Sequence, residues 1–123
     1  VNRIAIGEAT NIQDGSILHV DDDHPCLIAD HVHVGHHANL HGCVVERGAM
    51  VGIGAIVLSG ARVGAGAIVG AGSVVLEGMK IPPRTLAVGA PARVVRTVTA
   101  LDLAYIRSWV AKYVRLAKAY RDR

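Results

Sequence analysis

An aliphatic residue returns every six positions through most of this 123-residue chain. A period of six is neither the 3.6-residue period of a helix nor the two-residue alternation of a strand, so it indicates an internal structural repeat. The repeat is carried by Ile6, Ile12, Leu18, Ile28, Val34, Leu40, Val45, Val51, Val57, Val63, Val69, Val75 and Ile81.

Each hexad can form one short strand and one corner, so three hexads make one triangular coil. Successive coils then stack as parallel strands about 4.8 Å apart, with the aliphatic residue of each hexad in a narrow core. The 14 glycines suit tight corners, and the absence of phenylalanine agrees with a core too thin for a large ring. The sequence therefore predicts a parallel β-helix over residues 1–97.

The repeat has two irregularities. Ten positions separate Leu18 from Ile28, and the inserted segment contains three consecutive aspartates and a proline. Such residues do not belong in a buried strand, so we expect an exposed loop over residues 20–27. One residue is missing between Leu40 and Val45, which a corner can absorb.

The repeat also fixes where the histidines lie. Leu18 and Leu40 occupy the third face of adjacent coils, and His19 and His41 follow them directly. We therefore expect these two imidazoles to stack about 5 Å apart on one outer face. His36 is the third residue of a hexad on the second face, from which it cannot easily reach them within one chain. A threefold-related copy could bring it there, so the spacing predicts a homotrimer with a metal site at each subunit boundary.

Three neutral imidazoles with an open fourth position are typical of a catalytic zinc site. Such a metal lowers the pKa of its bound water towards neutrality and so provides a hydroxide nucleophile. Asn11 and Gln13 lie on the coil that carries His19, and their amides could orient that hydroxide, although both could equally be turn residues. The remaining histidines are expected to be solvated surface side chains, with His33 at a corner: His24, His31, His33 and His37.

Three segments resemble the gamma-class carbonic anhydrases, a family of hexapeptide-repeat proteins. They are Asn11–His19 (NIQDGSILH), Val34–His36 (VGH) and Leu40–Cys43 (LHGC). The later Val88–Ala92 (VGAPA) resembles the segment by which that family leaves its β-helix. The resemblance implies a left-handed parallel β-helix that forms a homotrimer.

The resemblance also implies a site. It implies zinc, with iron or cobalt as alternatives, held by His19 and His41 of one subunit and His36 of its neighbour. Gln13 and Asn11 match the residues that position the metal-bound solvent and the substrate. The implied reaction is the reversible hydration of carbon dioxide to bicarbonate by a metal-bound hydroxide at the trimer interface.

The sequence departs from the family pattern in two places. In the family an earlier coil carries an Arg-Gly-Asp segment, whose arginine pairs with the aspartate that matches Asp14. The chain opens at Val1 without that coil, so we expect Asp14 to lack this partner. The acidic loop that serves proton transfer has no clear counterpart, and residues 21–24 are candidate substitutes. Among them His24 is the best matched, because an imidazole titrates near the working pH.

The last segment, residues 98–123, predicts one α-helix that belongs to the same domain as the solenoid. Thr99 and Asp102 suit a capping box at its start. An apolar and aromatic stripe is expected to be buried along the prism: Ile106, Trp109, Val110, Tyr113, Leu116, Ala117 and Tyr120. The opposite face is expected to be solvated and carries Arg107, Lys112, Arg115, Lys118 and Arg121.

Composition and charge limit the binding partners and the cellular compartment that we expect. The formal charge of +3 sits largely on this helix, and without a nucleic-acid motif we expect no nucleic-acid partner. No apolar run reaches membrane length, and no signal peptide is visible, so we expect no membrane association. Cys26 and Cys43 are expected to be free thiols, which suits a reducing, cytoplasmic setting.

Two other functions stay open at this point. The first is a hexapeptide-repeat acyltransferase, in which one histidine acts as base and coenzyme A lies along the prism. The second is a catalytically weak, metal-bound trimeric assembly module. The acyltransferase interpretation leaves the three-histidine spacing and the Asn11–Gln13 pair unexplained.

Overall fold

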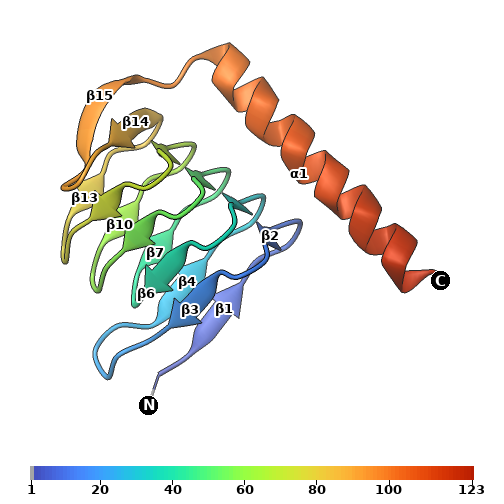
Figure 1. Ribbon diagram of the computed structural model, residues 1–123, viewed down its shortest axis with the longest axis horizontal. Coiled ribbons are helices and arrows are strands. Elements are labelled where there is room, and N and C mark those ends of the chain that lie inside the picture. Colours follow the sequence, from blue (N-terminus) through green and yellow to red (C-terminus); the bar gives the residue numbers. More distant parts are fainter. Residues whose placement is uncertain (1) are drawn as a thin grey trace.

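The computed structural model describes residues 2–123, which form a parallel β-solenoid with one long helix beside it (Figure 1). Three sheets make up its faces. The first face contains β1 (Ile4–Ile6), β4 (Cys26–Ile28), β7 (Val44–Val45), β10 (Arg62–Val63) and β13 (Lys80–Ile81). The second contains β2 (Asn11–Ile12), β5 (His33–Val34), β8 (Met50–Val51), β11 (Ile68–Val69), β14 (Thr85–Val88) and β15 (Arg93–Thr97). The third contains β3 (Ile17–His19), β6 (Asn39–His41), β9 (Ile56–Val57) and β12 (Val74–Val75).

Successive coils stack in register. Ile12 lies beside Val34 on the second face, and Val34 lies beside Val51. The aliphatic residues of the repeat are buried from Ile28 to Ile81, and Leu40 is wholly inaccessible to solvent. The predicted parallel β-helix of hexapeptide repeats, with its C-terminal helix, is confirmed.

The first coil departs from the predicted core. Ile6 is 51% exposed, and Ile12 and Leu18 are only partly buried. These residues have a stacked coil on one side only, so their apolar surface is covered from one direction. Ile4 and Ile17 are exposed in the same coil.

The inserted loop is shorter than expected. β3 ends at His19 and β4 begins at Cys26, so the loop covers residues 20–25, not 20–27. Cys26 belongs to the strand because its backbone N–H donates to the Arg3 carbonyl and its side chain is buried. Cys26 and Cys43 are free thiols, as predicted, and both are buried.

The chain leaves the solenoid through a reversal of direction. After β14 it passes Ala90–Pro91, whose peptide bond is cis, and β15 returns antiparallel to β14. Helix α1 (Ala100–Arg121) follows. The Thr99 hydroxyl accepts from the Asp102 backbone N–H, and the Asp102 carboxylate accepts from the Thr99 N–H, so the predicted capping box is present. The grouping of the solenoid and helix α1 into a single domain stays a prediction.

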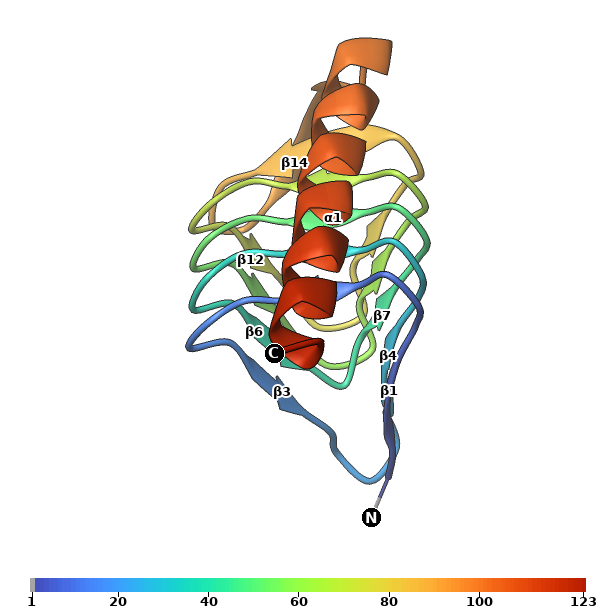
Figure 2. The ribbon, with the colours of Figure 1, turned by 90° about the vertical axis from the view of Figure 1, so that its right-hand side faces the viewer.

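Helix α1 runs along the solenoid and contacts β2 and β5 of the second face (Figure 2). Ile106 and Val110 are buried, and Trp109 and Tyr113 are half-buried. The predicted burial is wrong for the end of the stripe: Leu116, Ala117 and Tyr120 are exposed. Figure 1 shows the reason, because the C-terminal end of α1 stands clear of the strands. No helix within residues 2–123 is long and apolar enough to cross a membrane.

The buried aliphatic column should dominate the stability of the solenoid. Leu40→Ala removes a fully buried side chain and should lower the free energy of unfolding by about 2–5 kcal/mol. The same substitution at Leu101, which is 83% exposed, should change it by less than about 0.5 kcal/mol. Urea unfolding at one fixed protein concentration measures both. Equal losses in the two variants would contradict a core centred on this column.

Candidate metal site on the second and third faces

His19 and His41 lie side by side on the third face. They are directly opposite one another in the β3–β6 ladder, and their ring centroids are 5.1 Å apart. The predicted stacking is therefore confirmed. Within residues 2–123 neither ring has a hydrogen-bonding partner, so their nitrogen atoms are available to a ligand. Their role as metal ligands stays a prediction.

His36 lies elsewhere. It follows β5 at the corner between the second and third faces and is half-buried. No group of three histidine, cysteine, aspartate or glutamate side chains in the described part of the chain is close enough to hold a metal ion. One chain thus brings together two of the three predicted ligands.

Asn11, Gln13 and His33 form a connected polar cluster on the second face. Asn11 lies beside His33 in the β2–β5 ladder. Gln13 Nε2 donates to Asn11 Oδ1 at 3.2 Å and lies 3.2 Å from His33 Nε2. Because an amide nitrogen can only donate, His33 Nε2 must accept, which places the imidazole hydrogen on Nδ1. Both N–H groups of Gln13 are then used, and its Oε1 remains as an acceptor.

The predicted place of His33 at a solvated corner is wrong. His33 begins strand β5 and is only 5% exposed. Its ring lies 6.0 Å from that of Trp109 and 5.9 Å from that of Tyr113, so α1 covers it. Burial lowers the pKa of His33, and the nearby charge of His36 lowers it further.

This cluster leaves two buried nitrogen atoms without a partner in the described residues, Asn11 Nδ2 and His33 Nδ1. Unsatisfied polar atoms are costly and rare in a protein interior. One feature of the sequence indicates this cluster: Asn11 and His33 occupy equivalent positions of adjacent coils.

His24 is partly exposed and also has a hydrogen-bonding partner. Its Nδ1 lies 2.9 Å from Asp21 Oδ1 within the inserted loop, and a carboxylate can only accept this hydrogen bond. Hydrogen bonds from Ser59 first, and also from His24, hold the pKa of Asp21 well below its usual range. His31 and His37 are exposed, as predicted, and both have a positive φ.

The lowered pKa of His33 predicts a pH dependence of stability. Between that pKa and the ordinary value of 6.5, the unfolded chain binds a proton that the folded chain does not. The free energy of unfolding should therefore fall as the pH decreases through this window, and level off above it.

His33→Asn should remove this part of the slope, which begins as the pH falls through the ordinary value of 6.5. His31→Asn is the control, because His31 is exposed and asparagine tolerates its positive φ. Chemical denaturation at each pH makes the measurement. An unchanged slope in His33→Asn would show that His33 does not titrate differently on folding.

No protein-family model matches the chain. It is 47% identical over 118 residues to a protein of Methanocaldococcus jannaschii named "Probable carbonic anhydrase", covering 96% of this chain and 74% of that one. It is 39% identical over 126 residues to the mitochondrial gamma carbonic anhydrase 1 of Arabidopsis thaliana, covering 98% of this chain but 46% of that one.

The solved structures include the product of the Bacillus cereus BC4754 gene, named provisionally as an acetyltransferase. It superposes with a TM-score of 0.95 and 42% identity, over 97% of this chain and 69% of that one. The predicted enzyme class, a carbonic anhydrase-like lyase, is that of the two named sequence relatives. The chain belongs to the gamma-class carbonic anhydrase family of hexapeptide-repeat proteins.

Proposed function

We propose that this chain catalyses the reversible hydration of carbon dioxide to bicarbonate at zinc sites shared between the subunits of a homotrimer. The observation that carries the proposal is the adjacent pair His19 and His41, with ring centroids 5.1 Å apart, in a member of this family. His36 of a neighbouring copy would supply the third imidazole.

The donor set fits zinc. The paired imidazoles of His19 and His41 are not engaged by other side chains in residues 2–123, and imidazole nitrogen is a preferred zinc ligand. Two ligands from one chain do not complete a site, which supports a third from a second copy. When bound, zinc would lower the pKa of water enough for hydration chemistry near neutral pH.

Gln13 would orient the reacting groups. It is aligned with Gly35, one coil away, and Gly35 directly precedes His36. It would therefore enter the same shared site as His36. Because its two N–H groups are held by Asn11 and His33, its Oε1 would face the site as a hydrogen-bond acceptor.

His24 would return the proton that hydration releases. Asp21 accepts from its Nδ1–H, which leaves Nε2 as the nitrogen that takes up and gives away a proton. Exposed carboxylates are a poorer match to this task, since they titrate near 4.

Exposed apolar side chains support self-association. Ile17 on the third face and Ile53 at the corner next to it are 57% and 56% exposed. Apolar side chains gathered on one side of a soluble chain are typical of an interface. A cyclic trimer would bring the corner that carries His36 in one copy against the third face of the next.

The acyltransferase interpretation draws on the name given to the Bacillus cereus protein. In that case one histidine would act as a base on a hydroxyl or amine, and no metal would be needed. A metal-bound assembly module would carry zinc but give no hydration. Metal content separates the acyltransferase from the two zinc-bound alternatives. A hydration assay then separates the hydration enzyme from the assembly module.

The shared site predicts that His36→Ala and His41→Ala each lose zinc and hydration activity, because each removes one of three ligands. His37→Asn is the control, since His37 is the exposed neighbour of His36 and asparagine tolerates its positive φ. Zinc analysis and stopped-flow hydration measure the effects. Light scattering that finds a monomer in the presence of zinc would overturn the shared site.

Mixed assemblies sharpen this test. When His36→Ala and His19→Ala chains are co-assembled in equal amounts, about a quarter of the interfaces should regain all three ligands if mixing is random. Complementation of this kind is impossible if each chain holds its own metal. Zinc content that stays at the level of the single variants would therefore contradict the proposal.

Proton return through His24 predicts a dependence on buffer. Imidazole buffer should accelerate turnover, and the acceleration should be several-fold larger in His24→Ala, which loses the internal proton carrier. Asp23→Ala, in the same loop, is the matched control. Zinc content should be unchanged in both variants. Fast turnover that is indifferent to buffer in His24→Ala would assign proton transfer to another group.

A further inference from the structure

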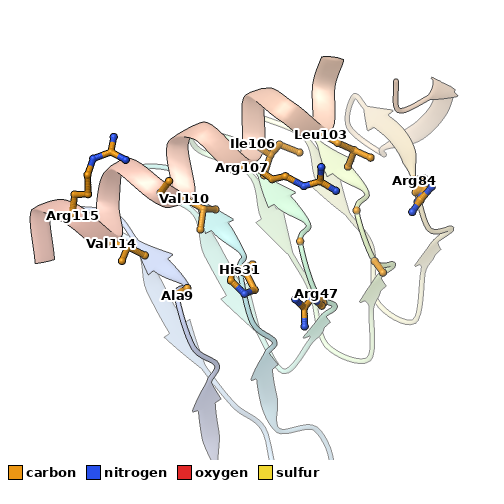
Figure 3. A pocket seen from close by; sticks show the side chains of 14 residues that line it. Ala9, His31, Arg47, Arg84, Leu103, Ile106, Arg107, Val110, Val114 and Arg115 are labelled. Atoms are coloured by element: carbon orange, nitrogen blue, oxygen red, sulfur yellow. The ribbon is translucent and has the colours of Figure 1, made fainter. Parts of the chain in front are cut away.

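A long groove separates helix α1 from the corner that joins the first and second faces (Figure 3). Its volume is about 770 Å³, within the range of small-molecule sites. None of its lining residues belongs to the candidate metal site. Ligand binding in this groove can therefore be tested independently of the proposed hydration activity.

The groove is open because two corner residues have no side chain. The stacked positions of this corner carry a positive φ in successive coils, and Gly48 and Gly66 occupy two of them, between His31 and Arg84. A Cβ atom at Gly48 would meet nothing within 4 Å. The space beneath helix α1 is therefore open at Gly48, whereas a Cβ atom at Gly66 would lie 3.3 Å from Arg84 Cγ.

The charge of the groove is of one sign. Four arginines and His31 line it, and no acidic residue does. Within residues 2–123 none of these four arginines takes part in an ion pair, whereas Arg62, Arg96 and Arg121 outside the groove each pair with a carboxylate. Unneutralised guanidinium groups in a groove favour an anionic ligand.

The two ends of the groove differ. Figure 3 shows Arg107 reaching over the groove towards Arg84, with Arg47 on the corner beside them. At the other end Val110 and Val114 face the solenoid. Three of the four arginines thus lie at the first end, with Leu103 and Ile106 beside them, and the apolar end is the one where Val110 and Val114 face the solenoid and Arg115 points away from it.

We propose that this groove binds a single-chain anionic amphiphile, with its carboxylate on Arg47, Arg84 and Arg107 and its alkyl chain over Val110 and Val114. A guanidinium binds a carboxylate through two parallel hydrogen bonds, which fixes the head group. The apolar end removes the alkyl chain from water. A small inorganic anion would leave that end wet, and a neutral amphiphile would leave the arginines unpaired.

The test is isothermal titration of the full chain with dodecanoate below its micelle concentration. Arg107→Gln and Arg47→Gln should each weaken binding about tenfold, through loss of a charge-assisted pair. Arg93→Gln is the matched control, because Arg93 is exposed and lies outside the groove. Octanoate should bind more weakly than dodecanoate, and acetate should not bind.

Other outcomes overturn the proposal. Absence of dodecanoate binding would do so, as would equal binding of dodecyl maltoside, which has the chain without the charge. Equal weakening in Arg93→Gln and Arg107→Gln would show attraction to overall charge and not to this groove. His41→Ala should bind dodecanoate like the unaltered chain, which separates this site from the metal site.

Discussion

The registered stacking of coils is the constraint on which the rest of the structure depends. Each coil donates backbone hydrogen bonds to the next, such as that from the Gly35 N–H to the Val51 carbonyl at 2.8 Å. The inward aliphatic residues prevent slippage, because a shift of one residue would turn the core side chains outward. Outward residues at the same hexad position therefore become neighbours. This one rule pairs His19 with His41 and Asn11 with His33.

That rule explains how much of the molecule could be predicted. Counting hexads was enough to assign strands to faces, to place His19 beside His41 and to locate the inserted loop, because these depend only on position within the repeat. The burial of His33 could not be predicted in the same way. It depends on which face of the prism α1 covers, and the helical stripe of the tail contains no information on its partner. Arg107 is exposed, as predicted, but its place on the groove could not be predicted either, because the groove also depends on which face α1 covers.

The third metal ligand, expected from a second chain, could not be placed from the repeat for a different reason. A repeat in one chain can be counted, but the approach of a second chain depends on surface shape and apolar area that six-residue spacing does not encode. If the metal site is shared, its occupancy depends on assembly, and assembly in turn is stabilised by metal. Dilution would then weaken both together, which a site inside one chain would not show.

Helix α1 connects the two candidate sites. Trp109 and Tyr113 cover His33, which in turn contacts the amide of Gln13. On a neighbouring side of the same helix, Arg107 and Val110 form one wall of the groove. Loss of helix packing would therefore disturb both sites at once. Substitution of Arg47, which lies on the solenoid and not on the helix, would alter the groove alone. Effects on the two sites can thus be separated by choosing which wall of the groove is changed.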